Sequence, residues 1–148
     1  TLAVWLARHA ATDGRHIVWF DGRGDFYPPA ALGWGVPAER LVVVRSENRR
    51  ELYWGMDQAL RCQGVGAAVG AIGRMTRAEA RRLQLAAETG GGIGLLLCPR
   101  ADEAENGGAA SRWHVRPLPS NGDARRLRVQ VVRCRGGHRR AGSGYAEV

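Results

Sequence analysis

Lysine is absent from this chain of 148 residues, and all 22 of its basic residues are arginines. A phosphate-binding P-loop needs a lysine in a glycine-rich turn before a helix, so these residues cannot contain one. Long apolar runs are also absent, since no stretch approaches the ~20 residues of a membrane span. No signal peptide is evident. The sequence therefore predicts a soluble, cytoplasmic protein with no membrane partner.

Cysteine is scarce, and the three that are present, Cys62, Cys98 and Cys134, are far apart and lack the spacing of metal ligands. We expect buried, reduced thiols at these positions. The four histidines lie in unrelated contexts, with no cysteine or carboxylate at ligand spacing. The sequence thus predicts neither a metal centre nor a histidine-based catalytic site.

Acidic residues are missing where nucleotide hydrolysis would need them. The apolar segment at residues 65–72 is followed by Gly73 and Arg74, with no carboxylate to hold magnesium. Asp21 follows the segment at residues 16–20, but we expect it to cap a loop, as aspartate often does in turns. We therefore predict no catalytic residue and no cofactor.

What the chain has in excess is positive charge, with a formal net charge of +8. Such a charge is typical of proteins that bind an acidic partner, nucleic acid among them. A GC-rich genome would explain arginine in place of lysine, but it would not explain the excess of basic over acidic residues.

Hydrophobic periodicity predicts alternating helices and strands, which is the signature of a parallel α/β sheet with right-handed crossovers. After residue 110 the pattern changes to strict alternation, which predicts an antiparallel hairpin added to that sheet. The length favours one domain over residues 1–148. We expect helices at residues 2–14, 26–34, 47–62 and 76–90. We expect strands at residues 16–20, 41–44, 65–72, 93–98, 111–118, 127–135 and 145–148.

The best-defined unit is the stretch Met75–Arg100. Thr76 and Glu79 have the spacing of a capping box at the start of a helix. Three glycines at residues 90–92 then supply the left-handed conformation that ends it. The strand that follows, at residues 93–98, has no polar alternation. We therefore expect it inside a sheet that is covered on both sides, and with it the buried strand at residues 41–44.

Three further local features are expected. Ser46 should be the N-cap of the helix at residues 47–62. On the surface of that helix, Asp57 and Arg61 should form an i, i+4 ion pair worth only a few tenths of a kcal/mol. The small side chains of residues 65–72 should let a helix or another backbone approach closely.

Two groups of arginines are candidate contacts for phosphates or an acidic protein surface. One group lies at the start of a helix, and the other on the outer face of the hairpin, where like charges opposite each other cost stability. A solvated face is the alternative for each group. The candidates are Arg74, Arg77, Arg81 and Arg82 in the first group and Arg112, Arg116, Arg126 and Arg128 in the second.

Several of these stretches resemble the ImuA family, RecA-like proteins of bacterial SOS mutagenesis. The resemblance is carried by RRLQLAAETGGGIGLLLCPR, SRWHVRPLPS and RRLRVQVVRCRGG, and by the helix RSENRRELYWGMDQALRCQGVGA. It extends over roughly Thr1 to Gly137. The opening TLAVWLARHA looks like the helix that follows the P-loop in RecA-type cores. We therefore expect the natural protein to have a longer N-terminal segment with the P-loop region.

The resemblance implies a RecA-like α/β core that acts in translesion synthesis after DNA damage. The implied partners are an ImuB-like protein, which resembles a polymerase without catalytic acids, together with RecA, an error-prone polymerase and DNA. Arg23 stands where a RecA ATPase carries its catalytic glutamate. This departure, with the missing magnesium carboxylate, favours a non-catalytic adaptor.

Two alternatives remain open. The helix–glycine–strand signature also resembles SulA, the SOS cell-division inhibitor that binds FtsZ, although the arginine-rich hairpin favours ImuA. The other alternative is a weak RecA-type ATPase whose P-loop lies upstream of residue 1.

Overall fold

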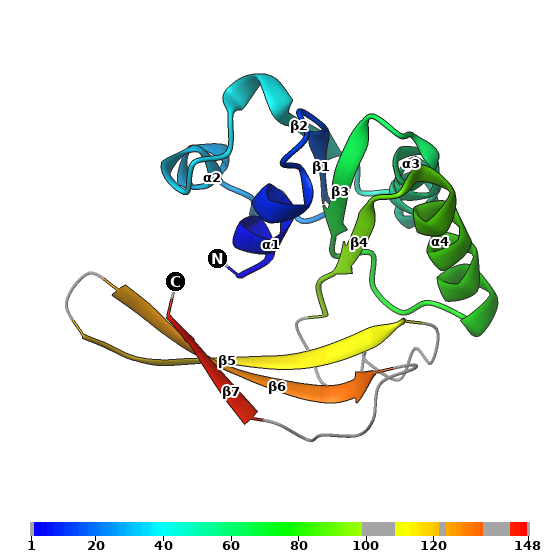
Figure 1. Cartoon of the computed structure of the whole chain (residues 1–148). Helices are drawn as coiled ribbons and strands as arrows, with labels where there is room; N and C mark the ends of the chain where they lie inside the picture. Colours follow the sequence, from blue (N-terminus) through cyan, green and yellow to red (C-terminus); the bar gives the residue numbers. More distant parts are fainter. Residues whose placement is uncertain (1, 99–108, 122–123, 135–142, 148) are drawn as a thin grey trace. The chain divides into compact units, whose positions relative to one another are not determined.

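A computed structural model describes residues 2–98, 109–121, 124–134 and 143–147 (Figure 1). Proximity of Cα atoms divides the chain into two compact units, Leu2–Gly108 and Ala109–Val148. That the two units make up one domain stays a prediction. Among the described helices, none has the length and apolar character needed to cross a membrane.

The first unit confirms the predicted α/β alternation. Its four strands pair in parallel in the order β2-β1-β3-β4. After β1 the chain therefore adds β2 along one edge of that strand, and it then crosses over to add β3 along the other edge. The elements are α1 (Leu2–Ala10), β1 (His16–Asp21), α2 (Pro28–Gly33), a 3₁₀ turn (Ala38–Arg40), β2 (Leu41–Arg45), α3 (Arg49–Arg61), β3 (Val65–Gly70), α4 (Arg77–Gly90) and β4 (Ile93–Leu96).

Helices cover both faces of this sheet because the central strands are apolar on both faces. Phe20 and Ala68 face α3 and α4, which lie side by side in Figure 1, whereas Ile17 and Val69 pack with α1 and α2. The buried helix residues are Leu52, Met56, Leu60, Ala80, Leu83 and Ala86 on the first face and Val4, Ala7 and Ala31 on the second, where Ala11, just after α1, is also buried.

The small side chains of β3 do admit a close backbone, as predicted. The register of β1 and β3 shifts between His16 and Ile17, and Gly66 lies at this irregularity. A Cβ atom at Gly66 would come within 2.6 Å of the carbonyl oxygen of Ala10, at the end of α1. Glycine is thus required here to seat α1 on the sheet.

The predicted helix caps are confirmed in α4 and corrected in α3. Thr76 and Glu79 form both halves of the capping box, and Gly91 ends α4 with φ 71°. In α3 the N-cap is Asn48, whose side chain accepts the backbone N–H of Arg50, and not Ser46. Ser46 lies two residues earlier and accepts the N–H of Asn48, because serine and asparagine compete for the same local donors.

The predicted interior positions of two strands are wrong, since β2 and β4 are the outer strands of this sheet. Val42 of β2 is 44% exposed and Ile93 of β4 is 37% exposed. Both faces of β4 are nevertheless covered, by Leu95 on the α1 side and Leu96 on the α4 side. An apolar run shows that two faces are covered, but it does not show whether both hydrogen-bonding edges are paired.

The second unit is an antiparallel sheet in the order β5-β6-β7. It confirms the predicted hairpin and final strand. The hairpin pairs with β7 and, among the described residues, with no strand of the parallel sheet, so its expected addition to that sheet is wrong. Alternation identifies a hairpin but not the edge with which it pairs. The strands are β5 (Ser111–Asn121), β6 (Ala124–Cys134) and β7 (Ser143–Glu147).

Candidate interaction surfaces

The carboxyl end of β1 is occupied by a structural aspartate. Asp21 is 4% exposed, and its Oδ1 accepts the backbone N–H of Asp25 at 3.1 Å. The Nε of Arg45 lies 3.4 Å from its other oxygen, Oδ2. Arg23 turns to Asp25, with 3.2 Å between Nε and Oδ2. The predicted loop-capping role of Asp21 is therefore confirmed.

The carboxyl end of β3 continues into Ala71, Ile72 and Gly73, and Ile72 is buried in the core. Within the described ranges, no group of three histidine, cysteine, aspartate or glutamate residues could hold a metal ion. Cys62, Cys98 and Cys134 are thiols as predicted, but they are exposed and not buried. Cys62 and Cys98 lie beyond the ends of α3 and β4, and Cys134 is the last residue of β6, so at these positions periodicity no longer reports burial.

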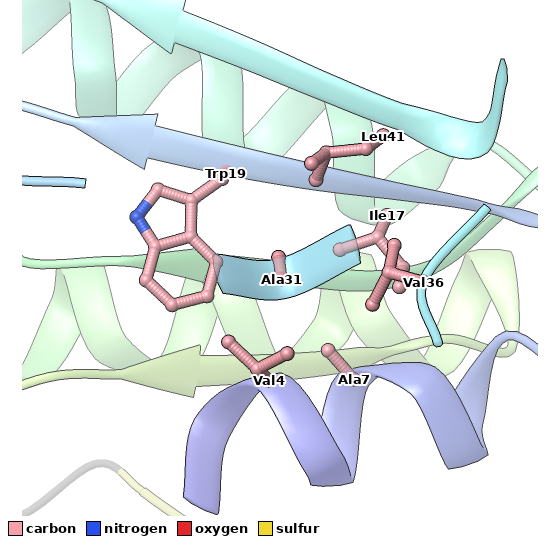
Figure 2. Close-up of a pocket in the computed structure, with 7 residues that line it drawn as sticks. All are labelled: Val4, Ala7, Ile17, Trp19, Ala31, Val36 and Leu41. Atoms are coloured by element: carbon pink, nitrogen blue, oxygen red, sulfur yellow. The ribbon is translucent and has the colours of Figure 1, made fainter. Parts of the chain in front are cut away.

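An apolar depression lies between α1, α2 and the sheet (Figure 2). No titratable side chain lines it, and it has no room even for a water molecule. We therefore regard it as part of the core packing. Its lining residues are Val4, Ala7, Ile17, Trp19, Ala31, Val36 and Leu41.

The main polar cluster of the first unit joins α3 to α4 at Asp57, which is 0% exposed. Arg61 donates to its two oxygens from Nε and Nη2, both at 3.2 Å. Arg82 does the same from α4, at 3.2 and 3.0 Å. The predicted pair of Asp57 and Arg61 is confirmed, but its place on the surface is wrong because Arg82 covers the carboxylate.

Electrostatics keeps this buried carboxylate charged. Burial alone would raise the pKa of Asp57, but the hydrogen bonds and charges of Arg61 and Arg82 outweigh it and lower the pKa. The same hydrogen bonds raise the pKa of Arg82. For Tyr53, which donates to the carbonyl oxygen of Glu79 at 3.3 Å, burial is the main cause of a raised pKa.

A second ion pair lies at the start of the same two helices. Arg49 donates to both carboxylate oxygens of Glu79 at 3.0 to 3.1 Å and to the carbonyl oxygen of Arg74 at 2.7 Å. Glu79 also accepts the backbone N–H of Thr76, which is the main reason that its pKa is lowered. The capping box of α4 is thus tied to α3.

The structure divides the first group of candidate arginines. Arg77 and Arg81 lie one turn apart on α4, and Arg74 precedes the helix; all three are exposed and belong to no ion pair within the described ranges. Arg82 is bound to Asp57. That any of the four contacts a partner stays a prediction.

The second group lies on β5 and β6. The register places Arg116 opposite Arg128 and His114 opposite Gln130, with Arg126 opposite Leu118. Because side chains alternate between faces, Arg116, Arg126 and Arg128 share one face, as expected. Arg112 lies opposite Arg133 beside an irregularity in the register. Their role in binding stays a prediction.

Sequence reasoning did not single out two exposed apolar side chains on the α3–α4 layer. Trp54 of α3 is 62% exposed and Leu85 of α4 is 43% exposed. Their positions on the outer side of each helix could have been read from the helical period, since the core positions Leu52, Met56 and Leu83 fall on the opposite side.

The fold has solved counterparts. The RadB recombinase matches with a TM-score of 0.65 at 14% identity, over 96% of this chain and 79% of that chain. SulA from Pseudomonas aeruginosa matches with a TM-score of 0.55 at 18% identity, over 64% of this chain and 82% of that chain. These similarities define the class of fold: the chain has a RecA-like α/β fold.

No protein-family model matches the chain. ImuA of Caulobacter vibrioides is 37% identical over 140 residues, 84% of this chain and 57% of that protein. The cell division inhibitor SulA of Edwardsiella piscicida is 36% identical over 95 residues, 64% of this chain and 56% of that protein. Over the aligned residues the chain belongs to the ImuA family and is related to SulA. It spans a little over half the length of these relatives.

Proposed function

We propose that this chain is the RecA-like part of a non-catalytic adaptor in SOS-induced translesion DNA synthesis. The observation that carries the proposal is the 37% identity to ImuA over 84% of the chain. Its main partner is an ImuB-like protein related to polymerases. RecA, an error-prone polymerase and DNA are the further partners. The protein acts in the cytoplasm and, after DNA damage, at the nucleoid.

The chemistry at the ends of the central strands supports a non-catalytic role. After β1 the chain carries Gly22 and Arg23, and after β3 it carries Gly73 and Arg74. Neither stretch supplies a carboxylate for magnesium or for activating water. Asp21 is the nearest acid to the end of β1, and it is engaged with Asp25 and Arg45.

A pull-down with the full-length protein tests the proposal. We expect capture of an ImuB-like protein, and no capture of FtsZ. Binding to FtsZ alone would overturn the adaptor in favour of a SulA-like cell-division inhibitor, a second candidate that the 36% identity to SulA favours.

The third candidate is a weak RecA-type ATPase whose P-loop lies upstream of residue 1. We expect negligible ATP turnover by the full-length protein. A measurable rate that is abolished by Asp21→Asn, with an unchanged circular dichroism spectrum, would contradict the non-catalytic proposal.

A further inference from the structure

The outer surface of α3 and α4 carries exposed apolar and basic side chains. Trp54 lies three residues before Asp57, and Arg61 lies four residues after it, so all three are neighbours on α3. Arg82 reaches Asp57 from α4, and Leu85 follows it by one turn. We call Trp54, Arg61, Arg82 and Leu85 the α3–α4 patch.

The patch contains more positive charge than its own carboxylate neutralises. One buried Asp57 binds two guanidinium groups, each through Nε and Nη2. The Nη1 atoms of Arg61 and Arg82 make no hydrogen bond to any residue that the structure describes. The two side chains remain 41% and 54% exposed. The pair therefore has one uncompensated charge and donors that still face solvent.

The guanidinium groups are also held in place before any partner arrives. Their hydrogen bonds to Asp57 have already removed much of the rotamer freedom that an arginine loses on binding. The planar guanidinium matches the geometry of a carboxylate. A second carboxylate from outside the chain would thus complete a preformed site.

The apolar members indicate a protein partner. An exposed tryptophan beside arginines is the composition of interface hot spots, and the 62% exposure of Trp54 leaves most of its surface for a partner to cover. The same two helices also expose Glu51 and Glu88. Because these carboxylates interrupt the positive charge, the surface offers no continuous track for the regularly spaced phosphates of a nucleic acid, whereas a peptide needs only one carboxylate at Arg61 and Arg82.

We propose that the α3–α4 patch binds an acidic segment of a protein partner. In this complex a partner carboxylate pairs with Arg61 and Arg82, and an apolar side chain beside it packs on Trp54 and Leu85. This inference rests on the proposed adaptor function, because an adaptor of this kind needs a protein-binding surface.

Nuclear magnetic resonance titration of the full-length protein tests the chemistry of the patch. The probes are a short peptide of glutamate and leucine, the same peptide with lysine in place of glutamate, and single-stranded oligothymidylate. We expect only the glutamate peptide to shift the indole N–H of Trp54 and the Nε–H signals of Arg61 and Arg82. The absence of these shifts, or equal shifts with oligothymidylate, would overturn the proposal.

Two substitutions remove the apolar part of the patch without touching the ion pairs, namely Trp54→Ala and Leu85→Ala. We expect Trp54→Ala to weaken binding of the glutamate peptide about tenfold or more, as for an interface hot spot, and Leu85→Ala to weaken it less. Val42→Ala is the matched apolar control, since Val42 is 44% exposed on β2. Arg23→Gln is the charge control. Equal binding by Trp54→Ala and Val42→Ala would contradict the proposal.

The same variants separate the patch from the proposed function. If the unchanged protein captures no ImuB-like partner but still binds the glutamate peptide at Trp54, the proposed function fails and the patch stands. If Trp54→Ala captures the ImuB-like partner as well as the unchanged protein does, the patch is overturned as that interface and the proposed function stands.

Discussion

The two arginine-rich surfaces of this protein are built on different principles. In the α3–α4 layer, Arg82 binds Asp57 and Arg49 binds Glu79, so these two arginines join the two helices, while Arg61 binds Asp57 within α3. In β5 and β6 there are six arginines and no aspartate or glutamate, and the acidic residue in register with them is Glu147 of β7, opposite Arg126. The six are Arg112, Arg116, Arg125, Arg126, Arg128 and Arg133.

From this difference we expect different partners. Paired arginines beside Trp54 suit a protein segment with separate acidic and apolar side chains. The arginines of β5 and β6 suit phosphates, which contribute charge at regular intervals and make affinity depend on salt. The register places Arg116 opposite Arg128, and an anion bound at this face would attract both guanidinium groups.

The largest effect is expected when the charge of the hairpin is reversed. In a variant with Arg112, Arg116, Arg126 and Arg128 all changed to glutamate, we expect affinity for single-stranded DNA to fall by about a hundredfold or more, because phosphate contacts dominate such binding. The slope of log affinity against log salt concentration should also become less steep, by about 0.7 for each phosphate contact removed.

Trp54→Ala is the control for this comparison, and it should leave both DNA affinity and salt slope unchanged. Circular dichroism should show that the four reversals keep the fold. Loss of fold would mean that the arginines of the hairpin are structural. An unchanged salt slope would remove the distinction between the two surfaces.

The sequence predicted best what is local. The capping box of Thr76 and Glu79, the glycine end of α4 and the alternation of β5 and β6 each depend on neighbours within a few residues, and the structure confirms all three. The fold class followed from the order of these elements. It was confirmed although β2 and β4 proved to be outer strands.

What the sequence could not show depends on long-range contacts. Asp57 looked like half of a surface pair because Arg61 is four residues away, but Arg82, 25 residues along the chain, buries it. The separation of the arginines on α4 into paired and exposed members follows from the same contact. The proposed α3–α4 patch likewise depends on Arg82, which only the packing of α3 on α4 brings to Asp57.

A smaller effect, on stability, is expected from Asp57→Ala. The change leaves two adjacent guanidinium groups without their carboxylate and removes four hydrogen bonds between charged groups. Because both arginines are partly exposed and can turn to water, we expect a loss of about 2 kcal/mol in the free energy of unfolding, below the cost for fully buried pairs. Urea denaturation measures this loss.

The matched control is Asp25→Ala, which removes the exposed pair with Arg23. We expect that change to cost less than about 0.5 kcal/mol. Similar losses in the two variants would mean that Asp57 is not the electrostatic link between α3 and α4, and the contrast with the hairpin would weaken.

The smallest effect is a dependence of stability on pH that the α3–α4 layer should show more strongly than β5 and β6. Since Arg61 and Arg82 hold the pKa of Asp57 below its usual value of 3.8, the charged carboxylate stabilises the fold above that value. This stabilisation is lost as the pH falls through the lowered pKa.

The difference in free energy of unfolding between the unchanged protein and Asp57→Asn should therefore be constant from about pH 7 to pH 5 and narrow below about pH 4. The corresponding difference for Arg116→Gln should change less over this range, because β5 and β6 carry no acidic group and Glu147 of β7 lies opposite Arg126 and not opposite Arg116. Urea denaturation of the unchanged protein, Asp57→Asn and Arg116→Gln at three pH values measures both differences. If the Asp57→Asn difference stayed constant down to pH 3, Asp57 would act through packing and hydrogen bonding alone, and the charge that orients Arg61 and Arg82 would have to come from elsewhere.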